Sequence, residues 1–319
     1  MREVLQFQPL YQQRVWGGRR LQSYLGRELP QGQPIGESWE IVDRPEAQSR
    51  VRGGNYVGAT LRELIEGHAA DVMGPGWIAS ARFPLLVKWL DCSDRLSLQV
   101  HPPAEVAPSL GGESKTENWY VAQSVPGASL FVGLKPGVTR EGFAKAVATG
   151  TAEGCVSKVS VASGDSILVR SGQVHAIDAG NLILEIQQNS DTTYRIYDWG
   201  RAGLDGRPRR LHVDESLRSI LWNEGPPELV RGAPTSGTIA SCDEFSIRRV
   251  VLGRAETVRF EAGEQPRILS VVAGGLTMAG AASGPRLLPR GENVLLPWSA
   301  DLEFGAPEPA IVLVTEDFT

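Results

Sequence analysis

The sequence has few cysteines and no concentrated block of positive charge. Its 319 residues include 3 cysteines and carry a formal net charge of −5. Cys92, Cys155 and Cys242 are far apart and form no Cys-x-x-Cys pair, which argues against a disulfide framework and a structural zinc site and favours a reducing, cytoplasmic compartment. Because no run of lysine or arginine accompanies the pI of about 5.6, we expect no nucleic-acid partner.

Segments typical of membrane insertion or secretion are also lacking. Residues 1–7, MREVLQF, contain no apolar core of signal-peptide length, and no segment predicts a membrane span. With 41% hydrophobic and 22% charged residues, the chain is typical of a soluble protein with one large core or two moderate cores. We expect a small-molecule or protein partner and no membrane association, and the sequence predicts no particular oligomeric state.

The distribution of turn-forming residues predicts a mainly β protein with a few short helices. The 36 glycines and 21 prolines are dispersed between short apolar runs, as in chains of many short strands. Short helices are predicted at 60–68, where Thr60 is the N-cap, at 139–150, and near 215–221. A composition change near Gly232 suggests two domains, 1–232 and 233–319.

A faint internal repeat supports this division into two domains. Residues 164–175 align without gaps on residues 291–302, and both copies read glycine, acid, polar residue and then three apolar residues. His175 of the first copy is replaced by Leu302 in the second. We therefore expect any metal chemistry in domain 1–232 and a degenerate second β domain without metal ligands in 233–319.

The stretch from Ser97 to His101 is the first candidate for a functional strand. In a strand, alternate side chains point to opposite faces, so Ser97, Gln99 and His101 share one face, and Leu98 and Val100 share the other. Buried polar groups without partners cost roughly 1–3 kcal/mol each, and a bound metal or ligand would remove that penalty. On these residues alone, a polar face wetted by solvent is the alternative.

Several other polar residues stand in apolar surroundings. Lys88 interrupts the apolar run 83–91, so its ammonium group either extends to solvent or binds an anion inside a cavity. Alternation places Glu117 on the same face as Lys115. Imidazole, carboxylate and amide groups suit zinc or a similar divalent ion, although sequence spacing does not show that they converge; the candidate ligands are Gln99, His101, Glu117 and His175.

Four motifs, in this order, resemble those of type I mannose-6-phosphate isomerases, most closely the short bacterial form. They are SLQVHP at 97–102, KTENWY at 115–120, GQVHAI at 172–177 and EIQQNSDTTYRIYDW at 185–199. The resemblance extends from Trp16 to about His212, and Pro103 and Arg170 depart from the family pattern. It implies two cupin-type (jelly-roll) β-barrels and the interconversion of mannose 6-phosphate and fructose 6-phosphate through a cis-enediol.

The resemblance also implies roles for individual residues. It implies one zinc ion per chain, held by Gln99, His101, Glu117 and His175. It places Arg195 beside the reacting carbons, where it neutralises developing charge, and it assigns the phosphate end of the pocket to Lys88, Ser97 and Lys115. The proton carrier stays open between Glu185, Lys115 and a metal-bound hydroxide, and an ion pair with Arg195 is the alternative role of Glu185.

Three rival functions remain at this stage. An iron-dependent cupin dioxygenase would use the same barrel site, but Gln99 among the ligands and Lys88 in the pocket count against it, because such oxygenases favour histidine-rich shells. A catalytically weak sugar-phosphate sensor would keep the pocket without turnover. An isomerase for another aldose phosphate would share the whole motif set.

Overall fold

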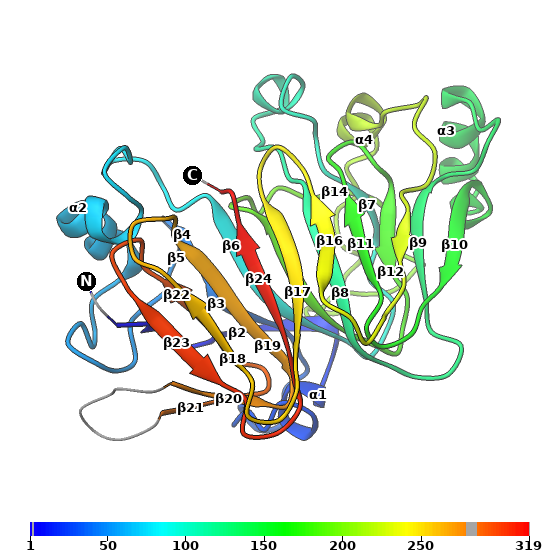
Figure 1. Ribbon diagram of the computed structural model, residues 1–319. Helices are drawn as coiled ribbons and strands as arrows, with labels where there is room; N and C mark the ends of the chain where they lie inside the picture. Colours follow the sequence, from blue (N-terminus) through cyan, green and yellow to red (C-terminus); the bar gives the residue numbers. More distant parts are fainter. Residues whose placement is uncertain (2, 279–285, 319) are drawn as a thin grey trace. The chain divides into compact units, whose positions relative to one another are not determined.

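The computed structural model describes residues 1, 3–278 and 286–318 of the chain, and Figure 1 labels its strands and helices. Strands β1 to β12 are Leu5–Gln6, Leu10–Gly18, Ile35–Ile41, Asp43–Arg44, Ala47–Gln48, Leu85–Cys92, Leu98–Val100, Glu117–Ser124, Ser129–Leu134, Val156–Ser160, Ser166–Val169 and His175–Ile177. Strands β13 to β24 are Asn181–Gln188, Tyr194–Tyr197, Leu229–Val230, Gly237–Ser241, Ser246–Leu252, Thr257–Phe260, Arg267–Ala273, Gly275–Met278, Arg286–Pro289, Asn293–Leu296, Leu302–Gly305 and Ala310–Glu316. The prediction of a mainly β chain is confirmed.

The helices are short and lie close to where the sequence predicts them. They are α1 (Arg20–Ser23), α2 (Leu61–Val72), α3 (Arg140–Ala148) and α4 (Val213–Ser219), with 3-10 turns at Ala107–Leu110 and Ala152–Cys155. Thr60 caps α2 in a capping box with Glu63, which satisfies backbone N–H groups of the first turn. Helix α2 runs past the predicted end at 68, although His68 has φ −140° and ψ 34°. Within the described ranges, no helix is long and apolar enough to cross a bilayer.

The chain divides into two compact units that are not continuous in sequence. The first unit comprises Met1–Leu10, Trp39–Leu86 and Ala233–Thr319, and the second comprises Tyr11–Ser38 and Val87–Gly232. Residues 233–319, for which the sequence predicts a separate β domain, thus share their unit with two earlier segments.

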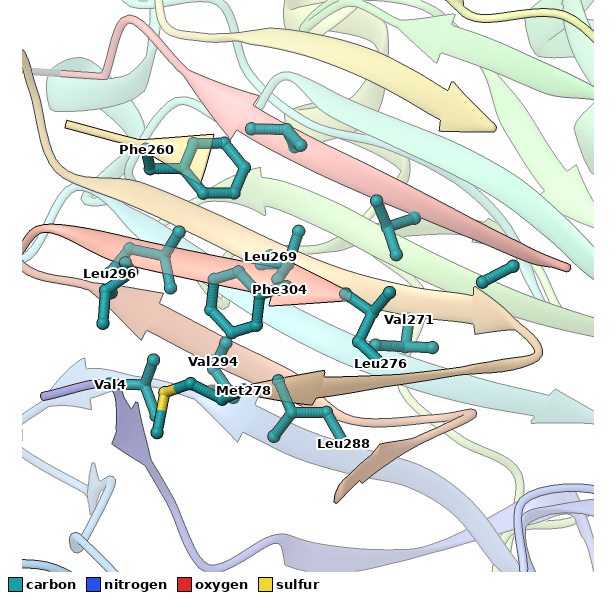
Figure 2. Close-up of a cluster of buried hydrophobic side chains, with 14 of the residues drawn as sticks. Val4, Phe260, Leu269, Val271, Leu276, Met278, Leu288, Val294, Leu296 and Phe304 are labelled. Atoms are coloured by element: carbon teal, nitrogen blue, oxygen red, sulfur yellow. The ribbon is translucent and has the colours of Figure 1, made fainter. Parts of the chain in front are cut away.

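The first unit is built from antiparallel sheets. A six-stranded sheet has the order β1-β22-β19-β24-β17-β16, and a four-stranded sheet has the order β18-β23-β20-β21. Side chains from both sheets form one apolar cluster, of which Figure 2 shows Leu269, Val294 and Phe304. Ser270, between Leu269 and Val271 on β19, is outside this cluster, as the two-residue period of a strand requires.

The predicted internal repeat has a structural counterpart at the start of β11 and β22. Each strand follows a turn with a left-handed glycine, Gly164 at φ 94° and Gly291 at φ 91°, a conformation that favours glycine. His175 is the first residue of β12, and its counterpart Leu302 is the first residue of β23. Leu302 packs into the apolar cluster of the first unit.

The second unit contains the candidate site, between two sheets to which it contributes most of the residues. A five-stranded sheet has the order β10-β9-β12-β7-β14, and a seven-stranded sheet has the order β15-β11-β8-β13-β6-β3-β2. One core cluster combines Leu130 of β9 with Trp119 of β8, and thus joins the two sheets. A further cluster includes Val100 of β7 and Phe143 of α3, so the five-stranded sheet has a second apolar face covered by helix α3.

Candidate functional site

Strand β7 directs its polar residues toward the interior of the second unit. Leu98 and Val100 pack in the cluster that includes α3, so Gln99 lies on the opposite face. In the antiparallel pairing of the five-stranded sheet, Gln99 is the register partner of both His175 and Arg195. Pairing of β7 with β12 and β14 therefore places Gln99, His175 and Arg195 side by side. Gln99 lies on the polar face that the alternation of residues 97–101 predicts.

The structure brings the predicted metal ligands together. One ligand atom each from His101, Glu117 and His175 lies within 4.8 Å of the others, and all three side chains are fully buried. The Nε2 atoms of His101 and His175 lie 3.4 Å from Oε2 and Oε1 of Glu117, respectively. The amide nitrogen Nε2 of Gln99 lies 3.2 Å from Nε2 of His175. The imidazole, carboxylate and amide groups thus face one small volume.

Backbone contacts orient the two imidazoles toward this volume. His101 Nδ1 lies 2.8 Å from the carbonyl oxygen of Thr192, and His175 Nδ1 lies 2.8 Å from that of Gln173. Since a carbonyl only accepts, each Nδ1–H donates, and each Nε2 keeps a lone pair for a metal.

Unsatisfied buried atoms show that the ligand set fits a divalent cation. Nε2 of His101 and Oε1 of Glu117 are buried and have no hydrogen-bond partner within the described residues. Leaving such acceptors unpaired in the interior is costly, and a cation among them would coordinate both. Nitrogen and oxygen donors of this kind suit zinc and similar borderline ions.

The electrostatics of the cluster favour the protonation states that metal binding requires. Burial and the neighbouring Lys115 cation lower the pKa of His101 to about 3, and burial lowers the pKa of His175. Burial opposes ionisation of Glu117, but Lys115, whose Nζ is 2.6 Å from Oε2, and the two imidazoles hold its pKa well below the usual value. Neutral imidazoles and an ionised carboxylate are therefore present at neutral pH.

A cavity of about 580 Å³ adjoins the cluster, and all of its lining residues belong to the second unit. Gln99 and Lys115 line the cavity and also contact His175 and Glu117, so the candidate metal site is next to it. The volume falls within the range of small-molecule sites. Six residues predicted for catalysis, binding or metal ligation line it, namely Lys88, Ser97, Gln99, Lys115, Glu185 and Arg195.

Glu185 lies between two lysines at the cavity wall. Its Oε1 accepts a hydrogen bond of 3.0 Å from Nε1 of Trp119, and Nζ of Lys115 and Nζ of Lys88 are each 3.9 Å from its carboxylate oxygens. Burial raises the pKa of Glu185 to about 7, although both lysines oppose the shift. Its ion-pair partners are thus lysines, and no ion pair between Glu185 and Arg195 occurs in the described structure.

Lys88 does not extend to solvent. Its side chain is 4% exposed, and its Nζ lies 3.6 Å from Oδ1 of Asp191 as well as near Glu185. The interpretation of Lys88 as a surface-directed lysine in an apolar strand is therefore wrong. The ammonium group faces carboxylates at the wall of the cavity.

Arg195 reaches the cavity from β14. Its Nη1 donates to the carbonyl oxygen of Arg210 at 2.8 Å, and its backbone N–H donates to Nδ1 of His212 at 3.2 Å. His212 thus supports the backbone of Arg195 and does not line the cavity.

Some cavity residues were missed at the level of sequence. Arg14 of β2 makes a two-point ion pair with Glu37 of β3, with distances of 2.9 and 3.0 Å. A Cβ at Gly36 would lie 2.5 Å from Cβ of Arg14, so the close strand approach requires glycine. Arg209 lies in a loop without a motif, where periodicity carries no signal. For Arg14 and Glu37, alternation along their strands was the one sequence signal, and it does not show which face lines a cavity.

The fold and the site define a cupin-type protein whose candidate His–Glu–His metal site opens onto a cavity lined by acidic and basic groups. A family model described as the catalytic domain of type I phosphomannose isomerase matches residues 4–124. Mannose-6-phosphate isomerase ManA of Bacillus subtilis is 36% identical over 307 residues, covering 93% of each chain.

Two further comparisons agree with these matches. The mannose-6-phosphate isomerase of Streptococcus mutans is 40% identical over 218 residues, covering 68% of this chain and 67% of that one. The crystal structure of the Bacillus subtilis mannose 6-phosphate isomerase superposes with a TM-score of 0.84 at 28% identity, covering 99% of this chain and 100% of that chain. The chain belongs to the type I phosphomannose isomerase family.

Proposed function

We propose that this protein interconverts mannose 6-phosphate and fructose 6-phosphate. The observation that carries the proposal is the convergence of His101, Glu117 and His175 beside a cavity that also holds Glu185 and Arg195. Such a site combines metal ligands, a carboxylate with a pKa near neutrality and a cation, which are the groups that a proton transfer next to a carbonyl needs.

We propose zinc as the metal, with one ion per chain. Gln99, His101, Glu117 and His175 would hold it, and the Gln99 amide would turn its oxygen toward the ion. When bound, the ion supplies Lewis-acid stabilisation of negative charge that develops on the substrate oxygens.

The residues of the chain would move the proton. Isomerisation of an aldose to a ketose moves the proton of C2 to C1 through a cis-enediol, while the hydroxyl proton passes from O2 to O1, so that C1 becomes CH2OH and C2 becomes the carbonyl carbon. Glu185, ionised above its pKa of about 7, takes the proton from C2 and returns it to C1. Lys115, close to both Glu117 and Glu185, stabilises their negative charge, and Arg195 neutralises charge on the enediolate.

Lys88, Ser97 and Lys115 would bind the sugar phosphate. All three line the cavity, and their ammonium and hydroxyl groups can donate hydrogen bonds to hydroxyl or phosphate oxygens. Since the cavity residues all fall within 1–232, we propose that catalysis belongs to that part of the chain, with 233–319 as a β domain without metal ligands. The free cysteines support a cytoplasmic location.

The test is a coupled assay that detects fructose 6-phosphate formed from mannose 6-phosphate, together with metal analysis. We expect turnover that a chelator abolishes and added zinc restores. The variant His101→Ala, which removes one proposed ligand, should lose both the metal and turnover.

Other outcomes would assign a different function. Binding of mannose 6-phosphate by zinc-loaded protein without turnover would identify a sugar-phosphate sensor. Iron content with substrate-dependent oxygen consumption would identify a dioxygenase, and faster turnover of another aldose phosphate would change the substrate.

A further inference from the structure

Two groups of cations line the cavity, and they differ in how their charge is compensated. The lysines lie close to carboxylates: Lys115 to Glu117 at 2.6 Å, and Lys88 to Asp191 at 3.6 Å. Both also lie near Glu185. Negative groups therefore already compensate much of the charge of the lysines, and a phosphate dianion would bind more favourably with a further cationic donor beside them.

Among the arginines that line the cavity, Arg14 and Arg209 each pair with a carboxylate, but within the described residues Arg195 does not. Arg195 makes no ion pair within the described part of the chain, and its partners are backbone groups. Burial and the nearby Arg209 cation lower the pKa of Arg195, with Arg201 and Arg14 acting in the same direction against Asp198. A guanidinium surrounded by other guanidiniums favours an anion in the adjoining cavity.

Arg209 is held in place by a buried carboxylate. Its Nε donates to Oδ2 of Asp198 at 2.7 Å and its Nη2 to Oδ1 at 2.5 Å. Asp198 is 5% exposed and also accepts from Nε of Arg201 at 3.0 Å. One carboxylate thus binds two guanidiniums, and Nη1 of Arg201 also lies 3.4 Å from Oδ2 of Asp94. Arg209 lines the cavity and Arg201 does not, so the guanidinium at the cavity wall shares its carboxylate with a second cation. The two-point contact also restricts the orientation of the Arg209 side chain.

The backbone before Arg209 is a closed hairpin. Ala202 and Pro208 form an isolated β-bridge, and the N–H of Gly203 donates to the carbonyl oxygen of Arg207 at 2.7 Å. The carboxylate of this hairpin that lines the cavity, Asp205, is exposed, so water screens its charge more than that of a buried group. The hairpin therefore delivers Arg209 to the cavity without a buried acid of its own.

We propose that Arg209 binds the phosphate group of the substrate and that Asp198 positions its guanidinium for this contact. The inference rests on the proposed function, because it assigns one group of the sugar phosphate to one end of the cavity. The Nη1 atom of Arg209 has no acceptor among the described residues, since Asp198 contacts only Nε and Nη2, and it supplies N–H donors. Arg209 thus gives the dianion a cationic donor, while Arg195, which makes no ion pair within the described residues, adds positive charge to the same cavity.

The test measures binding of inorganic phosphate to the metal-loaded protein by isothermal titration calorimetry. Since Arg209→Ala removes a charge-assisted hydrogen bond to the anion, it should weaken phosphate binding by roughly tenfold or more. Arg207→Ala is the matched control: the residue lies in the same hairpin, is exposed and does not line the cavity. Equal phosphate affinity of Arg209→Ala and wild type would refute the proposal.

Further variants keep the test informative if Arg209→Ala does not fold. Arg209→Lys retains the charge but not the two-point contact with Asp198, so we expect intermediate phosphate affinity. Asp198→Asn removes a negative charge, and electrostatics alone would then tighten phosphate binding. A positioning role predicts weaker binding, so tighter or unchanged binding by Asp198→Asn would refute the role of Asp198.

Turnover separates this inference from the proposed function. In the isomerase assay, Arg209→Ala should raise KM for mannose 6-phosphate roughly tenfold or more while kcat changes less. If wild-type protein binds phosphate through Arg209 but forms no fructose 6-phosphate, the proposed function fails and the phosphate site stands. If the enzyme is active and Arg209→Ala leaves both KM and phosphate affinity unchanged, the proposed function stands and the phosphate site at Arg209 is refuted.

Discussion

The pKa of Glu185 predicts how the reaction rate depends on pH. The carboxyl group is buried at the cavity wall, and burial raises its pKa to about 7 from the ordinary value of 4.5. A general base acts in its ionised form. Since the pKa is raised, Glu185 is protonated and inactive below about pH 7, and kcat rises as pH increases through 7.

The expected size of the effect follows from the same value. Two pH units below a pKa of about 7, at pH 5, about 1% of the carboxyl groups are ionised, so kcat should be roughly 100-fold below its plateau. The metal ligands should not titrate in this range, because the pKa of His101 is lowered to about 3. Glu185→Gln, which cannot accept the proton, should lower kcat by roughly 10²–10⁴-fold while the metal content stays the same.

The assay measures kcat at saturating mannose 6-phosphate from pH 5 to pH 8, with metal content and thermal unfolding recorded at each pH. These controls distinguish titration of the base from loss of metal or of the fold. A kcat that does not change over this range would refute Glu185 as the proton carrier. Turnover by Glu185→Gln within a factor of a few of wild type would refute it as well, and Lys115 would then be the candidate.

Three further predictions concern single side chains. Arg195→Ala should keep the metal and lose roughly 10²–10³-fold in kcat, because a positioned cation no longer neutralises the enediolate; normal turnover by this variant would contradict that role. Lys88→Ala should raise KM for the sugar phosphate roughly tenfold, and an unchanged KM would exclude a substrate contact. Burial opposes ionisation of Asp178, but hydrogen bonds from Arg95 and Ser129 lower its pKa to about 2. Because this folded-state pKa lies below the unfolded value of 3.8, the stabilisation is present above about pH 4 and is lost as pH falls to 2; Asp178→Asn should thus cost about 1–2 kcal/mol in urea unfolding at pH 7 and little at pH 2.

Local features of this chain follow from its sequence, because they depend on residues close to one another along the backbone. The two-residue period of β7 already separates Gln99 from Leu98 and Val100. The capping residue Thr60 marks the start of α2, since its side chain bonds within the first turn. The motif at 185–199 is long enough to indicate the family without a structure.

The convergence of the ligands, by contrast, is decided by the tertiary structure. His101 follows β7 and His175 begins β12 in one sheet, whereas Glu117 begins β8 in the other sheet. Their convergence therefore depends on hydrogen bonds between distant strands and on the packing of the two sheets. The pKa of Glu185 is likewise a property of burial and of lysines brought close by folding. No periodicity along the chain encodes either quantity.

The arginines at the cavity show most clearly what the sequence alone does not predict. Arg14 becomes a cavity residue because β2 pairs with β3 next to Gly36, and Arg209 because Asp198 holds it after a hairpin. The sequence by itself determined which residue types alternate, where helices begin and which family the motifs resemble. Only the folded chain decided which charges neighbour one another, because charges interact through space and not along the chain.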